Sequence, residues 1–133
     1  AYLNGQSLQV SSVRSMESSF VVTELPYNSE QYARTGEYLI RELYGRVAGI
    51  RMNGSAAIAL CYVAAGRFDA WLEAFLGKWD FSAAALIVQE AGGRVTDFYG
   101  NAGFIDGHHV VATNGWLHPF LLELVQKAMP LGM

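Results

Sequence analysis

Two acidic residues, Glu73 and Asp80, lie seven positions apart in a largely apolar part of the sequence. Asp80 follows Trp79 and precedes a run of small apolar residues that predicts a buried helix. A carboxylate that is buried without a partner costs several kcal/mol, so this position needs a physical cause. Asp80 could be the N-cap of the helix, or it could give an oxygen atom to Mg²⁺ as a metal ligand. The two roles are compatible because a carboxylate has two oxygen atoms.

The junction Gly54-Ser55-Ala56 is a second candidate site, because it opens a predicted helix directly after a predicted strand. Glycine allows close approach to the backbone, and the free N–H groups of a first helical turn attract an anion or a hydroxyl group. The simpler interpretation is that Ser55 only caps the helix. Glu73 lies near the end of another predicted strand, where ligands often bind in α/β sheets. A solvated acid at a strand end is the alternative for Glu73.

The histidine and cysteine residues of this sequence give little indication of a metal site or a catalytic nucleophile. His108, His109 and His118 have no third ligand at the spacing of a zinc site, so we expect structural or surface roles for them. Cys61 is the only cysteine and lies in an apolar stretch without a nearby base. We expect it to be a packed core thiol, with no intrachain disulfide and no role as a nucleophile.

Strands and helices are predicted to alternate along the chain. The Asn-Gly pair at Asn4-Gly5 predicts a hairpin. Strands are expected at residues 18–25, 49–53, 68–73, 94–98 and 109–113, and helices at 28–45, 54–65, 80–92 and 114–128. The alternation predicts an α/β fold of helix, sheet and helix layers, with a mixed and largely parallel sheet.

Taken in order, these motifs resemble the inositol monophosphatase family of Mg²⁺-dependent, lithium-sensitive phosphomonoesterases. The resemblance rests on Gly-Ser-Ala-Ala, then Tyr-Val-Ala-Ala-Gly-Arg-Phe-Asp-Ala, a strand-end Glu, Trp-Asp before a helix of small residues, and Glu-Ala-Gly-Gly. The flanking segments AYLNGQSLQVS, VVTEL and HHVVATNGWLHPFLLELV are similar too, so the likeness covers almost the whole chain. It implies the C-terminal half of that fold.

The resemblance also implies roles for the candidate residues. Asp80 matches an acid that ligates an active-site Mg²⁺ and contacts the substrate. Gly54, Ser55 and Ala56 match a backbone segment around the substrate, and Glu73 matches an acid that hydrogen-bonds the inositol ring.

The family holds its metal ions chiefly with a Glu-Glu pair and an Asp-Pro-x-Asp-Gly-Thr loop, and this sequence contains neither motif. The resemblance therefore implies an N-terminal half that supplies them, and a homodimer as in related enzymes. We expect no complete set of catalytic residues in this chain, and no activity from it alone. Residues 1–25 are expected to be remnant strands of an upstream sheet and the strand that leads into the domain, and residues 26–133 one α/β domain.

The composition argues against a nucleic-acid-binding protein and against a membrane-spanning one. The 133 residues are 52% hydrophobic and 16% charged, and the net charge is −3. Scattered basic residues and an acidic balance give no reason to expect nucleic acid as a partner, and no stretch is apolar enough to span a membrane. A single cysteine and the lack of a secretory leader favour the cytoplasm.

Three hypotheses of function follow. The first is part of a phosphatase that hydrolyses a small phosphate monoester, an inositol phosphate, with Mg²⁺-activated water. The second keeps this chemistry but changes the substrate to a 3'-phosphonucleotide or a sugar phosphate. The third is a non-catalytic binding or assembly module.

Overall fold

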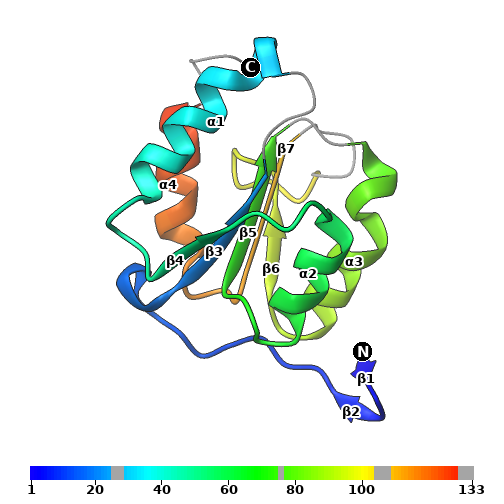
Figure 1. Cartoon of the computed structure of the whole chain (residues 1–133). Helices are drawn as coiled ribbons and strands as arrows, with labels where there is room; N and C mark the ends of the chain where they lie inside the picture. The colour runs from blue at the N-terminus through cyan, green and yellow to red at the C-terminus, as the bar shows by residue number, and fades with distance from the viewer. Residues whose placement is uncertain (25–28, 75–76, 104–108, 129–133) are drawn as a thin grey trace.

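A five-stranded mixed sheet lies between two layers of helices in the part of the chain that the structure describes (Figure 1). The structure is a computed structural model that describes residues 1–24, 29–74, 77–103 and 109–128, with the backbone alone at residues 29–32 and 78. The strand order is β4 (Gly49–Arg51), β3 (Phe20–Thr23), β5 (Ala70–Ala74), β7 (His109–Thr113) and β6 (Arg94–Thr96).

The sheet is mixed because one strand runs against the others. Strand β3 pairs in parallel with both β4 and β5, whereas β7 is antiparallel to β5 and β6. Four of the five strands therefore point the same way. The predicted α/β layers with a mixed, largely parallel sheet are confirmed.

Each face of the sheet carries one pair of helices, as Figure 1 shows. Helices α2 (Ala56–Ala64) and α3 (Lys78–Glu90) pack on one face around Trp71 and Phe81. Helices α1 (Ser29–Leu43) and α4 (His118–Ala128) cover the other. Alternation along β5 divides the two cores, since Trp71 belongs to the first and Leu72 to the second.

The N-terminal segment begins with the predicted hairpin. Strands β1 (Tyr2–Leu3) and β2 (Gln6–Ser7) pair in antiparallel register. Asn4 and Gly5 connect them with positive φ values of 52° and 81°, as the Asn-Gly pair predicts. A short 3₁₀ helix, η1 (Met16–Ser18), then leads into β3.

Asp69 and Asn114 hold this segment against the sheet. The hydroxyl group of Ser11 donates to Asp69 Oδ1 at 2.5 Å, and the Phe20 N–H donates to Oδ2 at 2.7 Å. The Asn114 amide donates to the Ser11 hydroxyl oxygen at 3.0 Å and to the Val13 carbonyl at 2.6 Å. Strand β3 belongs to the five-stranded sheet. The division into units at residue 25 stays a prediction.

Two predicted helix starts are wrong. The third helix begins at Lys78 instead of Asp80. The last helix begins at His118 instead of Asn114, whose side chain accepts the Leu117 N–H at 3.3 Å. The start predicted at Asn28 lies outside the described residues. No helix in the described ranges is long and apolar enough to cross a membrane.

His118 is a buried connection between α4 and the two strands β6 and β7. Its Nε2 lies 2.8 Å from the Thr96 hydroxyl, which donates its own proton to the Asp97 carbonyl. We therefore assign the ring proton to Nε2. Nδ1 lies 2.9 Å from the Thr113 hydroxyl, which already accepts the Gly115 N–H. Burial, with a smaller contribution from Arg94, lowers the pKa of His118 from its usual 6.5 to about 4. The predicted structural role of His118 is thus confirmed.

We predict that this histidine makes the fold sensitive to acid. The unfolded chain takes up a proton near pH 6.5, whereas the folded chain resists it down to about pH 4. Stability contributed by neutral His118 is therefore present above pH 6.5 and lost as the pH falls through this window. Urea unfolding of the wild type and His118→Gln at pH 7.5, 5.5 and 4.5 measures it. The variant should lose about 1 kcal/mol at pH 7.5 and depend less on pH. An unchanged pH dependence would contradict the assignment.

Candidate functional site

The parallel pairing of β3 with β5 brings two acids together at the C-terminal ends of these strands. Val22 lies opposite Trp71 and Thr23 opposite Leu72, so the next residues, Glu24 and Glu73, follow in the same register. Val22 and Trp71 both belong to the core under α2 and α3. Because side chains alternate along a strand, Glu24 and Glu73 lie on that same face.

Glu73 is buried without a full set of partners. Its side chain is only 4% exposed, and among the described residues its Oε2 has no hydrogen-bond partner. Burial, then the charges of Glu24 and Asp80, raise the pKa of Glu73 from its usual 4.5 to about 8. A buried acid with a strongly raised pKa and an unused oxygen atom is typical of a functional site. The solvated strand-end alternative for Glu73 is therefore wrong.

Asp80 lies in the first turn of α3, and its charge also acts on Glu73. Glu24, Glu73 and Asp80 are called the acidic group below. Asp80 is the third residue of the helix, and its Oδ2 accepts the N–H of the N-cap residue Gly77 at 3.1 Å. The Asp80 N–H donates in return to the Gly77 carbonyl at 2.9 Å. Asp80 thus forms half of a capping box and is not the N-cap itself. Within the described residues, Oδ1 accepts no hydrogen bond, so this half-buried carboxylate keeps one oxygen available.

The Gly54-Ser55-Ala56 junction lies at the N-terminus of α2. Ser55 is the N-cap, and its hydroxyl accepts the Ile58 N–H at 3.3 Å, so its capping role is confirmed. The role of this segment at a substrate stays a prediction. Gly54 has a φ of +77°, which favours glycine. Its N–H donates to Glu24 Oε1 at 3.0 Å, and the Ser55 N–H donates to Asn53 Oδ1 at 3.3 Å.

The N–H of Ala56 differs from those of its two neighbours. In the described part of the chain it has no hydrogen-bond partner, as expected for the first residue of a helix. Of the three residues in the predicted substrate segment, only Ala56 therefore offers a backbone donor to a ligand. The positive end of the α2 dipole adds to the attraction for an anion.

The structure thus gathers the predicted residues at one end of the sheet and adds Glu24, which the sequence analysis missed as a site residue. The predicted residues come from β5 and from the starts of α2 and α3. Glu24 follows β3 directly. Like Glu73, it is an acid at the end of a predicted strand, and this likeness could have identified it.

The acidic group fits a hard cation only in part. Carboxylate oxygens are the ligands that Mg²⁺ prefers, and the unused oxygen atoms of Glu73 and Asp80 have that chemistry. However, the described residues include no cluster of three or more acidic, histidine or cysteine side chains close enough to hold a metal ion. The described residues alone therefore form no complete site for a metal ion.

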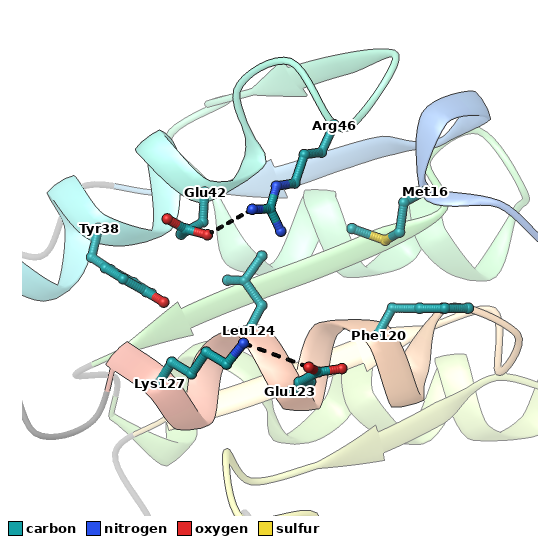
Figure 2. A pocket seen from close by; sticks show the side chains of 8 residues that line it. All are labelled: Met16, Tyr38, Glu42, Arg46, Phe120, Glu123, Leu124 and Lys127. Carbon is teal, nitrogen blue, oxygen red and sulfur yellow. Dashed lines mark ion pairs between the residues drawn. The ribbon is translucent and has the colours of Figure 1, made fainter.

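A groove between α1 and α4 lies on the opposite face of the sheet from the acidic group (Figure 2). It has a volume of about 150 Å³. Two ion pairs lie along it. Glu42 of α1 pairs with Arg46, just after the helix, at 3.2 Å, and Glu123 pairs with Lys127 within α4 at 3.5 Å. Since their charges cancel in pairs, the groove offers no net field for a phosphate ester.

Cys61 is half-buried and packs against the core under α2 and α3, in agreement with its predicted structural role. His109 begins β7, and its Nδ1 accepts the Phe98 N–H at 2.9 Å. His108 lies outside the described residues.

Comparison with known proteins matches residues 1–129 to the inositol monophosphatase family. Nus factor SuhB of Pseudomonas aeruginosa is 44% identical over 132 residues, which are 98% of this chain and 49% of the relative. Inositol-1-monophosphatase of Rhizobium meliloti is 36% identical over 132 residues, again 98% of this chain and 49% of the relative. The crystal structure of extragenic suppressor protein suhB from Bartonella henselae superposes with a TM-score of 0.89 at 34% identity, covering 95% of this chain and 49% of that one. The chain spans about half the length of these relatives.

We predict that Glu73 destabilises the fold as the pH rises. The folded chain keeps a proton up to about pH 8 that the unfolded chain releases near pH 4.5. Stability therefore falls across this window and is level on either side. Glu73→Gln cannot lose a proton, so it should be more stable than the wild type at pH 9 and similar at pH 4. Thermal unfolding measures this difference. Glu37→Gln, at an exposed acid on α1, should follow the wild type.

Proposed function

Because the chain belongs to the inositol monophosphatase family, we propose that it forms the C-terminal half of a phosphatase for a small phosphate monoester. The observation that carries this proposal is the buried Oε2 atom of Glu73, which has no hydrogen-bond partner among the described residues and is influenced by the charges of Glu24 and Asp80. We expect an inositol phosphate as the substrate. The relative from Rhizobium meliloti, named inositol-1-monophosphatase, supports this choice.

Asp80 is proposed as the Mg²⁺ ligand in this chain, through the Oδ1 atom that its capping role leaves unused. When bound, Mg²⁺ neutralises phosphoryl oxygens and lowers the pKa of an attacking water molecule. A single carboxylate cannot hold this ion in its preferred six-coordinate geometry. The remaining ligands would come from an N-terminal half, and this chain alone would be inactive.

Glu73 and the start of α2 are proposed to orient the substrate. The carboxyl group of Glu73 would hydrogen-bond a ring hydroxyl group, which would satisfy the unused Oε2 atom. Gly54, Ser55 and Ala56 would line the substrate with backbone, and Ala56 would donate its N–H. A 3'-phosphonucleotide or a sugar phosphate remains the alternative substrate. A panel of these esters, ranked by kcat/KM, separates the candidates.

The N-terminal half is proposed to cover the outer face of α2 and α3. Ile58 and Leu86 on this face are 52% and 56% exposed, although both helices are largely apolar. Exposed apolar patches of this kind mark protein contacts. We also expect a homodimer, lithium sensitivity and a cytoplasmic location, on the strength of the family. Sedimentation and inhibition by Li⁺ test the first two expectations.

A second candidate is a binding or assembly role without catalysis. It is favoured by the name Nus factor, which the Pseudomonas aeruginosa relative carries. The net charge of −3 still gives no electrostatic reason for direct binding to a phosphate backbone. Analytical ultracentrifugation with a Mg²⁺ titration separates the candidates, since a monomeric and well-folded protein that does not respond to Mg²⁺ would favour assembly.

We predict that Asp80→Asn in the full-length protein lowers kcat for inositol phosphate by about 100-fold or more, because one metal ligand is lost. It should also raise the Mg²⁺ concentration needed for half-maximal rate. Glu90→Gln is the matched control, since Glu90 is an exposed acid at the far end of the same helix. Wild-type activity of Asp80→Asn would refute the metal-ligand role.

We predict no turnover by residues 1–133 alone under conditions in which the full-length protein is active. The reason is the incomplete set of metal ligands in the described residues. Release of inorganic phosphate with Mg²⁺ and inositol phosphate measures both proteins. Turnover by the short chain would show that its own residues suffice.

A further inference from the structure

We propose that Glu24 is a positioning residue for this phosphatase site, holding the loop between β4 and α2 in the conformation that presents the first turn of α2 to the substrate. The inference rests on the function proposed above and adds a residue to it. It stands on the hydrogen bonds of one carboxylate oxygen.

Glu24 Oε1 accepts two backbone N–H groups from this loop. The Asn53 N–H donates at 2.8 Å and the Gly54 N–H at 3.0 Å. These residues are 29 and 30 positions away in the sequence, so the contact joins the end of β3 to the start of α2. Bonds from N–H groups to an ionised carboxylate are stronger than bonds to a neutral oxygen.

The loop needs such a restraint because packing does not hold it. Gly54 is exposed and has a φ of +77°, and a Cβ atom built on it would meet no other atom within 4 Å. A glycine without neighbours can adopt many backbone conformations. The two bonds to Glu24, with the bond from the Ser55 N–H to Asn53 Oδ1, select one of them.

The conformation of this loop matters for a ligand because Glu73 lies on the same side of the sheet. Glu73 is only 4% exposed and lies on the same face of the sheet as Glu24, and its Oε2 atom has no partner in the described part of the chain. The charges of both Glu24 and Asp80 raise the pKa of Glu73, so both acids lie within electrostatic range of it. A substrate that satisfies Glu73 and the Ala56 N–H together requires a fixed distance between them. Glu24 sets this distance because it lies next to Glu73 and bonds to the loop before Ala56.

Two substitutions of Glu24 separate the effect of side-chain length from the effect of charge. Glu24→Asp keeps the charge but is shorter by one methylene group, so it cannot bond both N–H groups without moving the loop. Glu24→Gln keeps the length and an acceptor oxygen but removes the charge. In the full-length protein we expect Glu24→Asp to raise KM for inositol phosphate about tenfold, with a smaller change in kcat. Glu24→Gln should stay within about threefold of the wild type. Glu17→Asp, at an exposed acid of η1, is the matched control.

Amide hydrogen exchange gives a readout that does not need activity. Faster exchange at Asn53 and Gly54 in Glu24→Asp, with slow exchange kept in Glu24→Gln, would support the positioning role. Equal KM and equal exchange in Glu24→Asp and the wild type would overturn it. A loss in Glu24→Gln alone would also overturn it, because that result would point to charge instead of side-chain length. If the wild-type protein hydrolyses no phosphate ester, the proposed function fails, and the exchange rates still decide whether Glu24 holds the loop.

Discussion

The parallel pairing of β3 with both β4 and β5 is the constraint on which the candidate site depends. Parallel strands end at the same edge of a sheet, so residues distant in sequence become neighbours there. The register with β5 puts Glu24 beside Glu73, and the pairing with β4 brings the loop at Asn53 within reach of Glu24. Because side-chain direction alternates, a shift of one residue in β3 would turn Glu24 to the opposite face.

The site places three acidic residues near one another, where burial raises the free energy of a negative charge. Glu73 shows this effect, since its pKa is raised to about 8 by burial and by the charges of Glu24 and Asp80. The positive ends of α2 and α3 offset part of this repulsion, and Asp80 and Glu24 each accept backbone N–H groups there. The Oε2 atom of Glu73 remains unpaired in the described chain. A group kept in this state is typical of a site completed by a ligand or a cation.

The two helix layers have different relations to solvent. Helices α1 and α4 are amphipathic, and two ion pairs line the groove between them, so they fit an exposed layer. Helices α2 and α3 are apolar on most sides and still expose Ile58 and Leu86. This asymmetry agrees with a chain that spans about half the length of its relatives. It suits the proposal that a further part of the protein covers α2 and α3 and completes the metal site.

Local patterns in the sequence determined most elements of the described fold. The hairpin at Asn4-Gly5, the capping role of Ser55 and the strand at residues 109–113 depend on neighbours in sequence, and all were predicted. Motif order indicated Glu73, Asp80 and the start of α2 as candidates. Only the tertiary structure decided that Glu24 joins them and that Asn114 holds the N-terminal segment. The physical reason is distance along the chain, because both roles come from contacts between residues many positions apart, and such contacts leave no periodic pattern.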